Sequence, residues 1–139
     1  MDYYIKEFND LQEEFHEVLH DYPLFSETID DIYEKDIKEI NELLEKNDEY
    51  YLKKAISKLK DIINYVKETS MSIKKEYSKF NKLANTWEKV RIVNVSDKEL
   101  SIINHKVNKA NELIGSHDLK DIIEANKIME SLLKDTKSL

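Results

Sequence analysis

An unbroken hydrophobic pattern in the middle of the chain constrains the fold more than any other feature. Between Leu52 and Trp87, residues suited to burial recur at alternating steps of four and three, and the pattern is weakest at Ser70. This spacing places every member on one side of an α-helix, as in a coiled coil. We call these residues the 52–87 stripe: Leu52, Ile56, Leu59, Ile63, Val66, Ser70, Ile73, Tyr77, Phe80, Ala84 and Trp87.

The composition extends this helical prediction to the rest of the chain. The 139 residues include one glycine and one proline, 40% are hydrophobic and 37% are charged. Few residues are therefore available for hairpin turns, whereas apolar side chains at regular spacing favour packed helices. We predict an all-α fold, an elongated helical bundle of about five helices with one long coiled-coil-like helix, kinked near Ser70 or straight. The chain is expected to form a single helical domain, 1–139, made of an acidic hairpin (1–46), a long basic helix (49–88) and a C-terminal hairpin (96–135).

Helix boundaries can be predicted in the N-terminal half from the apolar spacing and the capping residues. The apolar spacing predicts a helix from Asp2 to Asp21, which Pro23 ends. Ser26 is a good N-cap for the next helix. Residues 88–95 alternate β-branched side chains, so we expect an extended connection there.

Two further signals mark the C-terminal hairpin. Ser96 and Glu99 have the spacing of a capping box, which opens a helix. Gly115 stands where a left-handed C-terminal cap is expected, and the last helix follows from Asp118. A weak internal likeness joins the two halves of the chain, because Asn41-Glu42-Leu43-Leu44 resembles Asn111-Glu112-Leu113-Ile114, and an aspartate follows each at the same distance.

Several classes of protein are disfavoured by what the sequence lacks. Without cysteine, disulfide scaffolds, thiol catalysis and cysteine-containing zinc sites are excluded. No apolar run approaches the roughly 18 residues of a membrane span. The acidic N-terminus lacks the order of a secretion signal. We therefore expect a cytoplasmic protein that does not contact membranes and needs no cofactor.

The segment FHEVLH contains the HExxH pattern of zinc proteases, formed by His16, Glu17 and His20. In such enzymes the two histidines face the same way on a helix and bind one metal, while the glutamate polarises a water molecule. Here the pattern lies on the polar shoulder of the first helix, and Pro23 ends that helix soon afterwards. We interpret it as a solvated helix face and expect no enzyme, but a zinc-dependent hydrolase at 16–20 remains an alternative.

Charge is unevenly distributed along the chain. Residues 1–52 carry 4 basic and 17 acidic side chains, a balance of −13, whereas residues 53–91 carry 11 and 4, a balance of +7. We expect the acidic hairpin to pack beside the basic helix. A second alternative is a nucleic-acid-binding face on the basic helix, although the negative net charge of −7 makes nucleic acid an unlikely partner. Its lysines would be Lys53, Lys54, Lys58, Lys60, Lys74, Lys75 and Lys79.

The C-terminal third resembles the C-terminal helical segment of Hsp70-like (DnaK-related) chaperones. The resemblance rests on Trp87, Asp97, the run Ala110-Asn111-Glu112-Leu113-Ile114, Asp118-Leu119 and the pair Leu132-Leu133. It implies a helical appendage that contacts a chaperone or its client. The resemblance implies no ATPase activity, because the family's ATPase domain and β-sandwich have no counterpart in this chain.

Together these patterns favour a non-enzymatic helical module for protein–protein interaction, either an adaptor or a chaperone-associated protein. Its partner would be another protein or a second copy, with a homodimer possible through residues 52–87. We predict that the partner binds the exposed part of the 52–87 stripe, at Ile73, Tyr77, Phe80 and Trp87.

Overall fold

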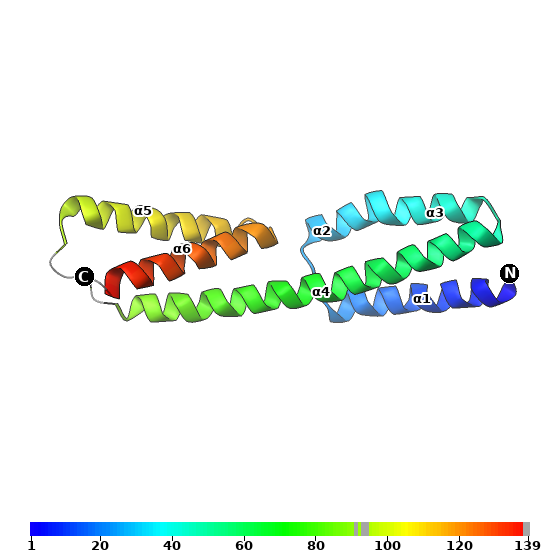
Figure 1. The fold of residues 1–139 in the computed structure, drawn as a ribbon, viewed down its shortest axis with the longest axis horizontal. Coiled ribbons are helices and arrows are strands. Elements are labelled where there is room, and N and C mark those ends of the chain that lie inside the picture. Colours follow the sequence, from blue (N-terminus) through cyan, green and yellow to red (C-terminus); the bar gives the residue numbers. More distant parts are fainter. Residues whose placement is uncertain (91, 93–94, 138–139) are drawn as a thin grey trace. The chain divides into compact units, whose positions relative to one another are not determined.

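The computed structural model describes residues 1–90, 92 and 95–137 (Figure 1). In these residues every regular element is a helix, which confirms the all-α fold. The elements are α1 (Asp2–Asp21), α2 (Ser26–Asp31), η1 (Ile32–Ile37), α3 (Lys38–Glu45), α4 (Glu49–Glu88), α5 (Asp97–Ile114) and α6 (Leu119–Lys137). Because α2, η1 and α3 follow one another without a break, they form one helical rod, which we call the second rod. The described chain therefore has five helical rods.

The chain forms two compact units that divide within α4. Unit 1 covers Met1–Met71 and unit 2 begins at Ser72. We expected a single domain whose parts ended between helices, whereas the division falls inside the longest helix. The third helix of unit 1 is the first part of α4, and the first helix of unit 2 is its second part. Each unit is therefore a three-helix assembly, and one helix belongs to both.

Unit 1 buries the apolar sides of three rods against one another. Phe8, Phe15 and Val18 contribute from α1, while Ile32 and Ile40 contribute from the second rod. The first part of α4 completes this core with Leu52, Ala55, Ile56, Leu59, Ile62, Ile63 and Val66. Burial of so many large apolar side chains, at about 1.5–3 kcal/mol each, holds the unit together.

Unit 2 has a core of its own. Phe80 from α4 packs with Ile103 and Ala110 of α5 and with Ala125, Met129 and Leu132 of α6. Trp87, Leu83 and Val107 are partly buried against this cluster. All members of the 52–87 stripe are thus buried or half-buried, including Ile73, Tyr77, Phe80 and Trp87, which we expected to be exposed.

Ser70, the weakest position of the stripe, is fully buried in unit 1. Its hydroxyl donates a hydrogen bond of 3.0 Å to the backbone oxygen of Pro23, in the connection between α1 and α2. A small hydroxyl side chain suits this place, because the connection supplies an acceptor that an apolar residue would leave unpaired. The helix α4 continues through Ser70 as one element from Glu49 to Glu88.

Helix boundaries mostly agree with the sequence, and two caps differ. The first helix spans Asp2–Asp21 as predicted, and the side chain of Ser96 accepts the expected hydrogen bond from Glu99 N at 3.1 Å. The predicted cap at Ser26 is wrong, because Ser26 is the first residue of α2 and Phe25 precedes it in extended conformation. In the 88–95 connection, Val90, Ile92 and Val95 lie outside helices and strands, whereas residues 91, 93 and 94 are outside the described part of the chain.

The prediction for Gly115 is also wrong. Its φ of −87° is right-handed, and the left-handed residue of this turn is His117, with φ of 60°. The turn before α4 has the same form, with Asn47 at φ 48°. The next residue in each turn caps the following helix: Asp48 accepts from Tyr50 N at 2.7 Å, and Asp118 accepts from Lys120 N at 2.9 Å. Asparagine and histidine adopt left-handed backbone angles more readily than most residues, so the presence of a single glycine did not mark the left-handed position of this turn.

These matching turns belong to a repeat that extends through both units. When 70 is added to a residue number of unit 1 (118 − 48), it gives the corresponding residue of unit 2, so Ile40 in the second rod corresponds to Ala110 in α5. The same shift pairs seven core positions: Ile40 with Ala110, Leu52 with Ile122, Ala55 with Ala125, Ile56 with Asn126, Leu59 with Met129, Ile62 with Leu132 and Ile63 with Leu133, all of them buried. A shift of 72 (80 − 8) places Phe8 of α1 on Phe80 of α4. The two units are therefore structural copies of one three-helix plan.

The π-helical segment η1 accommodates one residue that unit 2 lacks. In the second rod of unit 1 the buried Ile32 and Ile40 are eight residues apart, whereas their counterparts Ile103 and Ala110 in α5 are seven apart. A π-helical turn holds one residue more than an α-helical turn. The segment Ile32–Ile37 lies at this point, so both isoleucines face the core despite the additional residue. Before η1 the shift between the units is accordingly 71 (103 − 32).

Deletion of the exposed Glu34 tests this assignment. We expect η1 to become α-helical with the core register of α5, so that the free energy of unfolding changes by less than about 1 kcal/mol. Deletion of the exposed Asn108 is the matched control, because it turns Ile103 out of the unit 2 core and should cost about 3 kcal/mol. Urea unfolding followed by circular dichroism measures both. Equal losses of stability for the two deletions would contradict the interpretation that η1 holds one additional residue.

Asn126 is the one fully buried polar residue of α6 in the described structure. Its amide nitrogen donates to the backbone oxygen of Glu76 at 3.0 Å and to the carboxylate of Glu76 at 2.7 Å. Its side-chain oxygen is buried without a hydrogen-bond partner. The corresponding residue in unit 1 is the apolar Ile56, which shows that this position accepts a hydrocarbon side chain.

We therefore expect Asn126→Leu to raise the free energy of unfolding by about 1 kcal/mol, because it removes an unpaired buried acceptor. The opposite exchange in unit 1, Ile56→Asn, should lower it by about 3 kcal/mol, since no partner is in place for the new amide. Urea unfolding compares the two variants with the unaltered chain. A marked loss of stability in Asn126→Leu would show that its bonds to Glu76 outweigh the unpaired oxygen.

Candidate interaction surface

The four predicted partner-binding residues are buried or half-buried, and Phe80 belongs to the core of unit 2. Ile73 and Phe80 are each only 8% exposed, while Tyr77 and Trp87 are half-buried. The Tyr77 hydroxyl donates to the backbone oxygen of Ile114 at 3.4 Å. Partner binding at these four residues stays a prediction, and a partner could reach Ile73 and Phe80 only if the helices of unit 2 separated.

The histidines of the HExxH pattern are on the outside of α1. His16, Glu17 and His20 are all exposed, and Nδ1 of His20 lies 3.2 Å from the carboxylate of its neighbour Asp21. Among the residues that the structure describes, no group of three or more His, Cys, Asp or Glu side chains is placed to hold a metal ion. A metal at 16–20 would therefore lack a third protein ligand from the described chain, and the zinc-hydrolase alternative gains no geometric support.

The lysines of the basic helix are largely engaged within their own units. Lys60 pairs with Glu7 at 3.1 Å, Lys67 with Glu14 at 3.8 Å, and Lys79 with Glu130 at 2.6 Å. Lys53 and Lys54 lie over the rings of Tyr4 and Tyr50, at 4.9 and 4.8 Å from the ring centres. The hydrogen bond that Lys79 donates to the Glu130 carboxylate also raises the pKa of Lys79. The acidic hairpin thus packs beside the first part of the basic helix and forms ion pairs with it, as the charge distribution predicted for that part.

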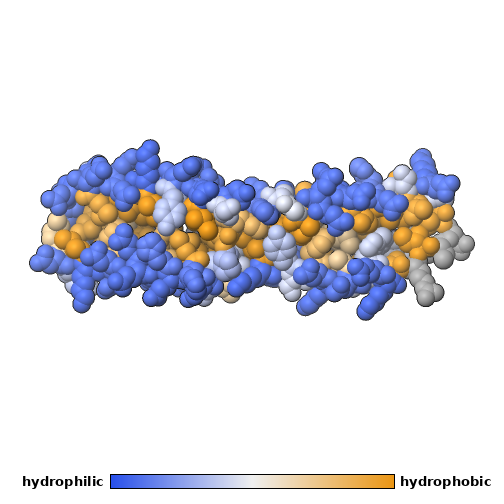
Figure 2. All heavy atoms as spheres, turned by 180° about the vertical axis from the view of Figure 1, so that it is seen from behind, coloured by the Kyte–Doolittle hydropathy of each residue, from blue (hydrophilic) through white to orange (hydrophobic). Residues whose placement is uncertain are grey.

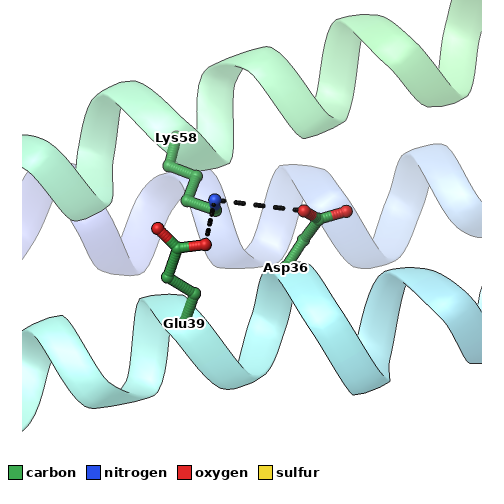
Figure 3. A network of polar contacts seen from close by, with 3 residues as sticks. All are labelled: Asp36, Glu39 and Lys58. Atoms are coloured by element: carbon green, nitrogen blue, oxygen red, sulfur yellow. Dashed lines mark hydrogen bonds and ion pairs between the residues drawn. The ribbon is translucent and has the colours of Figure 1, made fainter.

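Lys58 forms the most connected polar cluster in unit 1 (Figure 3). Its ammonium group reaches from α4 to the second rod and lies 2.6 Å from the Glu39 carboxylate and 3.9 Å from that of Asp36. The Lys58 side chain is 27% exposed, so water screens the pair less than it would at an open surface. This cluster closes one edge of a groove between the second rod and α4.

That groove has a volume of about 400 Å³ and a largely charged lining. We call it groove 1, and its polar lining residues are Thr28, Asp31, Lys35, Asp36, Lys58, Asp61 and Tyr65. Its two apolar lining residues are Ile32, which is buried, and Ile62. Groove 1 therefore presents charged groups that water and its own ion pairs already satisfy.

Unit 2 has the corresponding groove between α5 and α6, with a volume of about 200 Å³. We call it groove 2, and it is lined by Ile102, Ile103, Leu132 and Thr136 with Glu99, Lys106 and Asp135. The repeat shift of 71 residues places Thr28, Asp31 and Ile32 on Glu99, Ile102 and Ile103. The shift of 70 places Ile62 and Tyr65 on Leu132 and Asp135. The two grooves therefore occupy the same place in the two copies.

The two grooves differ most at one position. Where unit 1 has the exposed Asp31, unit 2 has Ile102, which is 48% exposed. Lys58 and Asp61 of groove 1 correspond to Ile128 and Ser131, so the charged edge of groove 1 is also missing. Figure 2 shows apolar residues visible between charged borders on the face that it draws. Ile102 is thus an apolar side chain at a place where the fold itself accepts a carboxylate.

Sequence periodicity did not identify groove 2. Ile102 stands beside the core residue Ile103 in the run Leu100-Ser101-Ile102-Ile103, and a helical pattern assigns only one of two adjacent isoleucines to the core. The internal likeness between the two halves of the chain has a shift of 70 residues (111 − 41), which pairs Ile102 with Ile32. Only the additional residue at η1 brings Asp31 to the place of Ile102, so the sequence alone did not reveal this difference.

The chain matches no protein-family model, no curated protein and no solved structure. In the part of the chain that the structure describes, none of the helices is both long and apolar enough to span a membrane.

The burial of Phe80 predicts that it stabilises unit 2. We expect Phe80→Ala to lower the free energy of unfolding by about 3–4 kcal/mol, because it leaves a cavity in the core. Met71→Ala, at a position of α4 that is 61% exposed, is the control and should change stability by less than about 0.5 kcal/mol. Urea unfolding tests both variants. A Phe80→Ala chain as stable as the control would show that Phe80 is free to bind a partner.

Proposed function

We propose that the chain is a non-enzymatic helical module that binds a protein partner, either another protein or a second copy, through groove 2. The observation that carries this proposal is the half-exposed Ile102 in an apolar groove whose counterpart has Asp31. A solvent-exposed isoleucine gains nothing from this position in the isolated chain, but it contributes burial when a partner covers it. Glu99, Lys106 and Asp135 surround it with the polar border that is typical of interfaces.

The shape and size of groove 2 favour a helical segment as its ligand. A groove between two helices accepts the ridge of side chains on a third helix, which inserts apolar residues spaced three and four apart. The resemblance to Hsp70-like chaperones makes a chaperone or one of its clients the first class of heterologous partner to look for. We place this interaction in the cytoplasm.

The experiment is affinity capture from native cell extract with three forms of the chain. Ile102→Asp places a carboxylate in groove 2 where unit 1 already has Asp31, so it should fold normally. Met71→Asp introduces the same charge at an exposed site on α4 and serves as the control. We expect the unaltered chain and Met71→Asp to retain the same protein, and Ile102→Asp to retain at least tenfold less of it.

Circular dichroism should first establish that all three forms are equally helical. Capture of the same proteins in equal amounts by all three would exclude groove 2 as the binding surface. The purified chain also provides an independent readout, because a partner identified in this way can be titrated against each form. Binding of that partner that does not respond to Ile102→Asp would have the same consequence.

A further inference from the structure

Charged residues flank Ile102 on its own helix in an order that is self-complementary. Glu99 precedes it by three residues and Lys106 follows it by four, and all three line groove 2. At 100° per residue they lie within about 60° of one another on one side of α5. The exposed side of α5 thus has an acid at one end, an apolar side chain in the middle and a base at the other end.

We propose that the occupant of groove 2 is a second copy of this chain, bound through α5 in antiparallel orientation. This inference rests on the proposed function, since it takes groove 2 to be a protein-binding surface. A twofold axis that crosses α5 between residues 102 and 103 pairs each position with the one equally far on the other side. It places Glu99 of each copy opposite Lys106 of the second copy, so two opposite-charge pairs form.

The same axis brings the apolar parts together. Ile102 is next to the axis, so the side chains of the two copies meet at the centre and each faces the Leu132 side of the other groove. A parallel pairing would instead oppose Glu99 to Glu99 and Lys106 to Lys106, which is repulsive. The arrangement of charge on α5 therefore favours a second copy as the partner and the antiparallel orientation over the parallel one.

The contact between one pair of helices is small compared with a standard interface, so the dimer should be reversible, with a dissociation constant on the order of micromolar. This differs from the homodimer through residues 52–87 that the sequence suggested, because the stripe is occupied by the cores of units 1 and 2. Dimerisation through α5 leaves both cores intact.

Analytical ultracentrifugation of the purified chain across the micromolar range tests the proposal. We expect a concentration-dependent shift from the 16.6 kDa monomer to the dimer. Ile102→Asp should weaken the dimer at least tenfold, and Met71→Asp should leave it unchanged. A chain that stays monomeric throughout, or a dimer that Ile102→Asp does not weaken, overturns the proposal.

Charge exchange then tests the orientation. Glu99→Lys places like charges opposite each other in the antiparallel pair, and so does Lys106→Glu, so each variant alone should dimerise about tenfold more weakly. An equimolar mixture of the two should regain the affinity of the unaltered chain. In the mixed dimer one copy has a lysine at both positions and the other has a glutamate at both, so each pair is again of opposite charge. A mixture no tighter than either variant alone overturns the antiparallel arrangement.

The outcomes also separate this inference from the proposed function. If the chain remains monomeric but captures another protein through Ile102, the second copy is excluded as the occupant and groove 2 remains a binding surface. If neither self-association nor capture responds to Ile102→Asp, both proposals are overturned. Self-association that Ile102→Asp and the charge exchanges weaken, and that the mixture restores, supports both.

Discussion

The structure depends on the burial of a single helical stripe by two different sets of neighbours. The residues of α4 from Leu52 to Ser70 are buried in unit 1, and those from Ile73 onward are buried or half-buried in unit 2. Most of the stability of a helix in a protein comes from packing of its apolar side, so α4 depends on packing along the 52–87 stripe. Each unit therefore stabilises a segment of helix that the other unit continues, and folding of the two units is expected to be coupled through α4.

The repeat explains features that look like irregularities in one unit alone. The π-helical segment η1 is a rare conformation, but it keeps Ile32 and Ile40 in the core despite one additional residue. The left-handed Asn47 and His117 fill one turn position in both copies, followed by the capping Asp48 and Asp118. Retention of the turn and of the buried positions, with variation in exposed charge, is the pattern expected when packing constrains two copies and their surfaces are free to diverge.

Much of this fold could be predicted because periodicity reports which side of a helix is buried. The bounds of α1 and the inward direction of the 52–87 stripe followed from the spacing of apolar residues alone. What periodicity does not report is which neighbour covers a stripe, so the division at Met71 was not foreseen and Ile73 and Phe80 were taken for a free surface. The cap at Gly115 was mistaken for a related reason, because the left-handed residue of a turn depends on where the next helix begins. Groove 2 was missed because adjacent isoleucines at 102 and 103 cannot be assigned to core and surface from spacing.

Because α6 corresponds to the first part of α4, each of these two segments could in principle pack into the wrong unit during folding. An exchange of these segments would bring Asn126 into the place of Ile56, where its amide would lose the Glu76 acceptors that it has in unit 2. Burying a polar group without a partner costs about 1–3 kcal/mol, and the exchanged Asn126 would bear this cost in unit 1. The imperfectly satisfied Asn126 can thus lower the stability of the correct fold slightly while it penalises the wrong pairing more, which is a reason for a polar residue to persist at the centre of an apolar core.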